Sequence, residues 1–145
     1  MSTSSQADVY QIVYISGATQ PIADRDLRVL ANSFAQRNKQ LHVTGLLLYH
    51  NKRFMQFLEG DIMIVGGLFE KIRNDPRHHS VFVMRRQYVL NRQFPDWTMR
   101  LAAPDEIGNV ESELYKHLSY GGEPGASLDR LATESWAMLN AFRYS

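Results

Sequence analysis

The sequence contains no cysteine, which excludes disulfides, cysteine metal sites and cysteine nucleophiles. It also lacks an excess of either charge, since 16 Lys and Arg stand against 15 Asp and Glu and the net charge is +1. This balance argues against a nucleic-acid footprint and against an electrostatic membrane anchor. No apolar run reaches the roughly 18 residues of a membrane span, and residues 1–8 lack the basic and apolar regions of a signal peptide. We therefore expect a cytoplasmic protein with no nucleic-acid or membrane partner.

The motifs of several common chemistries are missing as well. The sequence has no GxGxxG or GxxxxGK[ST] phosphate loop and no GxSxG nucleophile turn. His78 and His79 are adjacent, but no HExxH motif and no evident carboxylate partner accompanies them, so we expect no metal site. What is present is a chain of which 44% is hydrophobic, enough for an ordinary globular core.

The apolar pattern predicts an α+β fold. We expect strands, rich in β-branched and aromatic residues, over 9–16, 43–50, 53–58, 81–90 and 97–101. Helical spacing of apolar residues predicts helices from Asp24 onward and over 65–72. The first four strands and two helices follow the order βαββαβ, which is ferredoxin-like, with an extra fifth strand. In this order we expect the first and third strands to be parallel neighbours.

Two of these strands, 43–50 and 53–58, have no polar face, which predicts that helices cover both sides of the sheet. The first two helices would cover one side, and a C-terminal extension would cover the other. This extension should contain a short helix over 111–118 and a last helix capped by Ser127. The expected organisation is a flexible leader (1–8), a domain (9–101) and a C-terminal helical extension packed on the sheet (102–145).

Two polar side chains stand out inside the predicted strands. Gln56 lies in the apolar segment FMQFL, where an unpaired amide would cost about 1–3 kcal/mol. Its partner is either the protein itself or water, which is the ordinary case, or a polar ligand. Tyr14 lies on the first strand, where it can reach Gln56, although a core tyrosine is usually structural.

Other residues carry weaker signals. The segment Asp75-Pro76-Arg77-His78 ends a helix, and its arginine and histidine could also donate hydrogen bonds to a polar ligand. Asn38 follows the first helix and would ordinarily act as a helix C-cap. Trp97 and Met99 alternate on the last strand and would ordinarily fill the core.

Two glycines, Gly66 and Gly67, interrupt the second helix, at a cost of about 1 kcal/mol each against alanine. They indicate either close approach of a backbone or a bound ring, or simply a weak helix.

Taken together, several segments resemble the BLUF family of bacterial blue-light sensors in identity, order and spacing. The resemblance covers 9–101 and rests on the motifs VYQIVYIS, VTGLLLY, FMQFLEGD, NDPRHHS and RQFPDWTM. It implies a photoreceptor that is not an enzyme and that binds FAD non-covalently between its first two helices. FMN or riboflavin would be the alternative ligands.

The resemblance also implies roles for individual residues. Tyr14 falls on the family's photoactive tyrosine, and Gln56 on its switching glutamine. The flavin would be held by Asn38, Gln56, Asp75, Arg77 and His78, and the signal would be relayed by Trp97 and Met99. Three features depart from the family pattern. The tight turn expected at Asn51-Lys52 replaces a commoner Asn-Gly turn. Ala23 replaces a usual serine cap, so that Asp24 is expected to cap instead, and Arg37 replaces another polar residue, often asparagine.

Residues 102–145 show no evident catalytic output domain, so we expect signalling to a partner protein in trans. Because this tail is amphipathic and rich in aromatic residues, we also expect a homo-oligomer formed through it. Candidate exposed aromatic residues in the tail are Tyr115, Tyr120, Trp136 and Tyr144. Two alternatives belong to other classes: a ferredoxin-like ligand-binding or assembly module without light chemistry, and a small heme- or flavin-dependent enzyme on the same fold.

Overall fold

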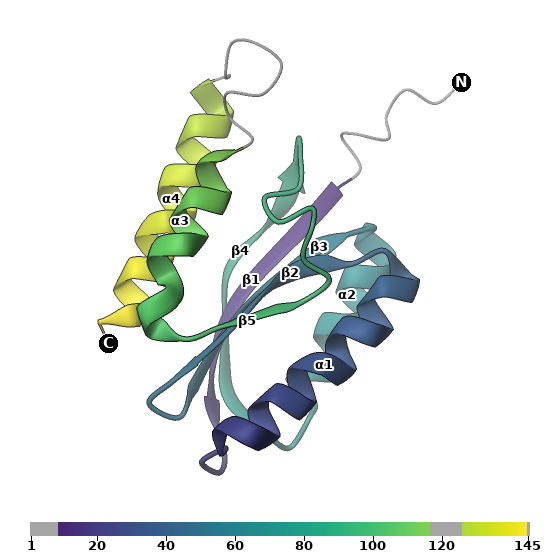
Figure 1. Ribbon diagram of the computed structural model, residues 1–145. Coiled ribbons are helices and arrows are strands. Elements are labelled where there is room, and N and C mark those ends of the chain that lie inside the picture. The colour runs from purple at the N-terminus through teal and green to yellow at the C-terminus, as the bar shows by residue number, and fades with distance from the viewer. Residues whose placement is uncertain (1–8, 117–125, 145) are drawn as a thin grey trace.

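The computed structural model describes residues 9–116 and 126–144 and contains one mixed five-stranded sheet between two helical layers (Figure 1). The strands are β1 (Val9–Ala18), β2 (Thr44–His50), β3 (Arg53–Gly60), β4 (His78–Val89) and β5 (Arg100–Ala102). The helices are α1 (Asp24–Leu41), α2 (Ile62–Arg73), the 3₁₀ turn η2 (Pro104–Glu106), α3 (Ile107–Lys116) and α4 (Ala126–Arg143). This is the predicted ferredoxin-like order with an added strand and C-terminal helices.

The strand order across the sheet is β4-β1-β3-β2-β5. The expectation that the first and third strands run parallel is wrong, because β1 pairs with β3 antiparallel. The connection through α1 leaves β1 and β2 running in the same direction, and the hairpin between β2 and β3 turns β3 opposite to β2. Because β3 lies between them in the sheet, it is antiparallel to both. The antiparallel register places Tyr14 directly opposite Gln56.

The turn between β2 and β3 is tight, as predicted. Asn51 and Lys52 both have positive φ, 52° and 60°, the combination that a type I′ hairpin turn requires. The fifth strand is shorter than predicted, because the chain bends at Thr98 and Met99 and pairs with β2 only from Arg100 onward. The Trp97 carbonyl oxygen accepts a hydrogen bond from the Gly45 amide at 2.8 Å.

Helix α1 differs from the prediction at both ends. Asn38 does not follow the helix as a C-cap but lies inside it, fully buried, and the left-handed C-cap is His42 with φ 55°. Asp24 does not cap the N-terminus either. Ala23 occupies that position without a side-chain hydrogen bond, and Asp24 is the first helical residue.

Helix α2 begins at an aspartate cap, since Asp61 accepts hydrogen bonds from the amides of Met63 and Ile64. A Cβ added to Gly66 or Gly67 would meet no atom within 4 Å, so no other part of the described chain approaches them.

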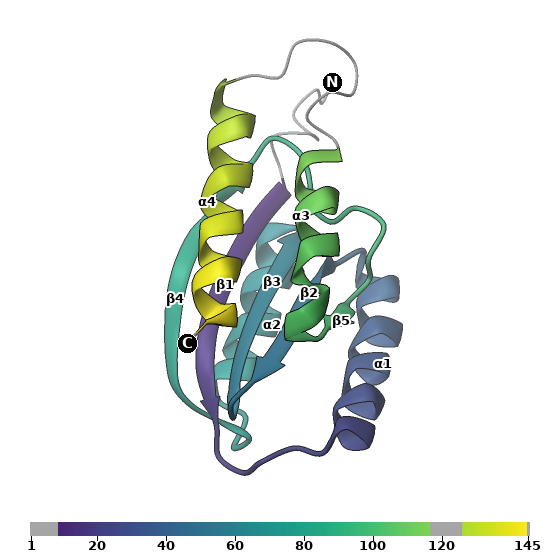
Figure 2. The same ribbon diagram turned by 60° about the vertical axis from the view of Figure 1, so that its left-hand side comes forward.

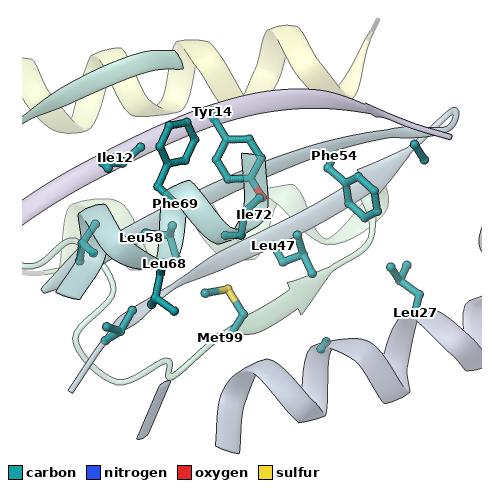
Figure 3. Close-up of a cluster of buried hydrophobic side chains, with 14 residues drawn as sticks. Ile12, Tyr14, Leu27, Leu47, Phe54, Leu58, Leu68, Phe69, Ile72 and Met99 are labelled. Atoms are coloured by element: carbon teal, nitrogen blue, oxygen red, sulfur yellow. The ribbon is translucent and has the colours of Figure 1, made fainter. Parts of the chain in front are cut away.

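Each face of the sheet carries its own core. Helices α1 and α2 cover one face, and α3 and α4 cover the other (Figure 2). The first core, between the sheet and α1 and α2, includes Ile12, Tyr14, Leu47, Phe54, Leu58, Phe69 and Met99 (Figure 3). The second core includes Val13, Leu46, Met55, Phe57, Phe94, Ile107 and Leu139. The two-sided cover explains why the central strands show no polar face.

The expected cap at Ser127 and the exposure of Tyr120 lie outside the described side chains. Within the described residues, no helix has both the length and the apolar character needed to cross a membrane.

Candidate functional site

The centre of the site is a hydrogen-bonded pair on neighbouring strands. The Tyr14 hydroxyl donates to Oε1 of Gln56 at 2.5 Å, and both residues are 1% exposed. Burial raises the pKa of the Tyr14 phenol far above its ordinary value, against the opposing influence of the Arg37 charge. Tyr14 is therefore a neutral phenol whose proton points at the side-chain carbonyl oxygen of Gln56.

The other end of the Gln56 amide meets a much weaker partner. Its Nε2 donates to the sulfur of Met99 at 3.3 Å, and a thioether is a poor acceptor. Met99 is buried in the same core as Tyr14 and lies on the same side of the sheet (Figure 3). A buried amide donor thus lacks a strong acceptor.

Trp97 lies on the opposite side from Met99. Its ring stacks on Phe94 at 5.3 Å between centroids and packs against the second core. The Arg100 guanidinium lies over it at 5.0 Å. The bend before β5 therefore turns Met99 toward Gln56 and Trp97 toward α3 and α4.

Helix α1 adds two polar side chains to the site. The Asn38 amide donates to the carbonyl oxygen of Thr98 at 3.0 Å, which ties α1 to the segment that carries Met99. Arg37 donates through Nε to Asn38 Oδ1 at 3.2 Å and lies over the Phe34 ring at 4.9 Å. Its Nη2 is buried and has no hydrogen-bond partner in the part of the chain that the structure describes.

In the segment Asp75-Pro76-Arg77-His78, the histidine packs against the core, and the aspartate and arginine lie near the surface. His78 shares a hydrogen bond with Ser16 Oγ at 2.8 Å, and its ring lies against Tyr14 and Phe54, 6.1 and 4.8 Å away between centroids. Asp75 and Arg77 instead pair with each other near the surface at 2.6 Å. Hydrogen bonds from Arg77 are the main reason why the pKa of Asp75 falls to about 2.

Two cavities flank α1. One, of about 470 Å³, is lined by Ile22, Leu30, Ser33 and Arg77 among others. The other, of about 460 Å³, is lined by residues that include Ala31, Tyr49 and Met99. Arg77 lines the first of these cavities and Met99 the second, whereas Tyr14, Asn38 and Gln56 line neither.

The donor set fits a ligand rich in hydrogen-bond acceptors. Gln56 Nε2 has only a thioether as acceptor, and Arg37 Nη2 has none among the described residues. Buried donors are ordinarily satisfied, so a group with carbonyl and ring-nitrogen acceptors matches what the two side chains lack. A flavin is such a group. The described residues contain no cluster of three or more His, Cys, Asp or Glu that could hold a metal.

Sequence reasoning missed a second polar group, around Glu59. This carboxylate is fully buried and accepts hydrogen bonds from Gln11, Thr44 and the amides of Gln93 and Phe94. A signal was present, because Gln11 lies in an apolar strand as Gln56 does. The partners in the loop before β5 had no pattern of their own.

The comparisons agree with this geometry. The sequence model of the BLUF family, described as sensors of blue-light using FAD, matches residues 9–100, and the chain belongs to this family. Photoactivated adenylate cyclase subunit beta from Euglena longa is 36% identical over 108 residues, which cover 74% of this chain and 13% of that protein. The chain therefore spans a small part of the curated relatives it matches.

Solved structures match over most of the chain. The dark-state structure of BlrB, a BLUF protein, has a TM-score of 0.65 and 26% identity, and the match covers 89% of this chain and 98% of that one. Klebsiella pneumoniae BlrP1 with FMN and cyclic diGMP has a TM-score of 0.71 and 27% identity, covering 90% of this chain and 34% of that one. Residues 9–100 are therefore a flavin-binding blue-light sensor rather than an enzyme.

Proposed function

We propose that this chain binds FAD non-covalently and senses blue light by switching the hydrogen bonds of Gln56, and that it signals to a partner protein. The observation that carries the proposal is the Tyr14–Gln56–Met99 chain, in which one buried amide has a phenol on its oxygen and a thioether on its nitrogen. Asn38, Gln56, Asp75, Arg77 and His78 would hold the cofactor. FMN appears with the similar BlrP1 structure and is an alternative ligand.

Bound flavin would supply blue-light absorption and reversible one-electron chemistry. Tyr14 supplies a neutral phenol whose proton already points at Gln56. A primary amide has a donor and an acceptor on one rotatable group, so Gln56 can change its hydrogen bonds without changing its charge.

The proposed switch would reach Met99 through the Gln56 amide. Reversing the amide would place Oε1 against the Met99 sulfur, so two acceptors would face each other where a donor now meets the sulfur. The methionine side chain has several rotatable bonds and can move away from such a contact. Met99 would then report the state of Gln56 to the segment before β5.

The test has two parts. Denaturation of the purified protein should release FAD, and release of no flavin even after reconstitution would contradict the proposal. Tyr14→Phe should keep the flavin and lose the reversible red shift, whereas Tyr10→Phe on the same strand should keep both.

The output is proposed to be contact with a downstream protein in trans, together with self-association. Relatives carry this type of domain within adenylate cyclases, as in a bacterial light-regulated adenylyl cyclase and the Euglena proteins. The family match disfavours a ligand-binding or assembly module without light chemistry. The expected cytoplasmic location stays a prediction.

A further inference from the structure

We propose that Glu59 is a positioning residue that clamps the loop before β5 to the sheet, and that its buried polar network carries the movement of Met99 to helix α4. This inference rests on the proposed light sensing and names the route of its output. The contacts of this network lie on the face of the sheet opposite Gln56.

Glu59 occupies the central position of a row across three strands. In the sheet register it lies opposite Gln11 on β1 and opposite Thr44 on β2. Gln11 Nε2 donates to Oε2 at 2.9 Å, and Thr44 Oγ1 donates to Oε1 at 3.1 Å. The opposite face of the same three strands carries residues of the light-sensing face. These include Tyr14 on β1 and Gln56 on β3, so the row shares its backbone with the switch.

The Glu59 carboxylate also accepts hydrogen bonds from the loop between β4 and β5. The amide of Gln93 donates to Oε2 at 2.6 Å, and the amide of Phe94 donates to Oε1 at 3.0 Å. Phe94 in turn stacks on Trp97, two residues before Met99. A loop without regular structure is thus fixed at one end by a buried carboxylate, and Met99 extends from the other end of that loop.

The network continues into α4. The Gln93 side-chain oxygen accepts hydrogen bonds from Gln11 at 2.9 Å and from Ser135 Oγ at 2.9 Å. Ser135, which is fully buried, accepts from Arg85 at 2.7 Å. Arg85 also donates to Gln11 Oε1 at 2.8 Å and pairs with Glu134 at 3.5 Å.

These contacts explain why a small shift of the loop cannot remain local. A buried polar group that loses its partner is destabilised. A shift of the loop therefore either moves Ser135 together with Gln93 or breaks the hydrogen bond between them. Both responses alter α4. Burial raises the pKa of Glu59, while hydrogen bonds from the loop amides and from Gln11 and Thr44 oppose the rise.

The test compares Ser135→Ala with Thr133→Ala in the full chain loaded with FAD. Both delete a hydroxyl from α4, but among the described residues the Thr133 hydroxyl meets the Tyr115 hydroxyl, at 3.4 Å, outside the network. Hydrogen exchange of residues 130–143 is measured in the dark and under blue light, with the flavin spectrum recorded on each sample. We expect Ser135→Ala to keep the red shift and to reduce the light–dark difference in exchange several-fold, and Thr133→Ala to match the wild type.

A second variant tests the hydrogen bonds between Glu59 and the loop before β5. Glu59→Gln keeps the shape of the side chain but replaces one acceptor oxygen with a donor that opposes a loop amide. The chain has two tryptophans, so in a Trp136→Phe background the tryptophan fluorescence comes from Trp97 alone. We expect Glu59→Gln to keep the red shift and to lose the light-induced change in Trp97 fluorescence.

The outcomes separate the two proposals. A wild-type protein without a red shift overturns the proposed function, and this inference with it. A normal red shift with an unchanged α4 difference in Ser135→Ala, or with an unchanged Trp97 response in Glu59→Gln, overturns the network alone.

Discussion

Gln56 and Arg37 show that the sequence predicts some residues of the site but not their contacts. An amide inside FMQFL must have partners, and this physical requirement pointed to Gln56 before any contact was known. The sequence could not show that the amide donor reaches Met99, since that contact joins residues 43 positions apart. Arg37 stood out only as a departure from the family pattern, and its buried Nη2 is visible only in the structure.

Arg37 is expected to contribute to flavin affinity. Arg37→Met removes a buried donor that lacks a protein acceptor among the described residues, and a hydrogen bond from a charged group contributes about 1.5–3 kcal/mol. FAD should bind at least about tenfold more weakly, as measured by fluorescence quenching on the apoprotein. Arg25→Met, an exposed change on the same helix, is the control. Equal affinities for Arg37→Met and the wild type would remove Arg37 from the site.

Asp75 gives a prediction about pH. Its pKa falls from 3.8 to about 2 in the folded chain, because Arg77 stabilises the carboxylate. The resulting stabilisation is present above the ordinary pKa and is lost as the pH falls toward 2. Because the pair is close to the surface, the effect should stay below about 1 kcal/mol. In urea unfolding, the wild type should exceed Asp75→Asn in stability at pH 6 and lose that advantage near pH 2.5. A difference that grows with acid would reverse the sign and contradict the assignment.

At the scale of elements, local patterns predicted the strands and helices well and their relations less well. The Asn51-Lys52 turn and the helix that ends before Pro76 follow from local chemistry. The direction of β1 against β3 and the placement of Asn38 inside α1 depend on contacts far apart in sequence. The early end expected for α1 was wrong because Asn38 is buried and bonds to Thr98 rather than to the helix end.

The β2–β3 turn offers a stability test. Lys52 has φ 60°, and this left-handed conformation costs a residue with a side chain roughly 1–2 kcal/mol. Lys52→Gly removes that strain, while the greater freedom of glycine in the unfolded chain offsets part of the gain. We expect an increase of up to about 1 kcal/mol in the free energy of unfolding, measured in urea, with the photocycle unchanged. Lys39→Gly, inside α1, should change stability in the opposite direction. Destabilisation by Lys52→Gly would mean that the turn needs the lysine side chain.

At the scale of the whole molecule, the sheet separates the proposed light-sensing face, which α1 and α2 cover, from the face that α3 and α4 cover (Figure 2). Two-sided burial of the central strands predicted this division, and the cores on both faces show it. The polar network that joins the loop before β5 to α4 was not predicted, because its members come from β1 to β4, the loop and α4. Large exposed apolar side chains also occur on edge strand β4, at Phe82 and Tyr88, which the sequence had placed only as strand residues.

Self-association through the tail is expected to depend on Tyr144. This residue is 72% exposed, whereas Tyr115 and Trp136 are partly buried against the second core. Tyr144→Ser should weaken a homo-oligomer measured by light scattering over a concentration series. Phe82→Ser, an equally drastic change on exposed β4, should leave it intact. Dissociation by Phe82→Ser alone would move the interface to the edge strand, and a monomer at every concentration would exclude the oligomer.

The most direct test of the account is the light-minus-dark absorption spectrum of FAD-loaded Gln56→Leu beside the wild type. Leucine fills the same space in the core but has neither the acceptor for Tyr14 nor the donor for Met99. The account predicts a small reversible red shift of oxidised flavin in the wild type and none in the variant, with flavin bound in both. A normal red shift and recovery in Gln56→Leu would contradict the hydrogen-bond switch.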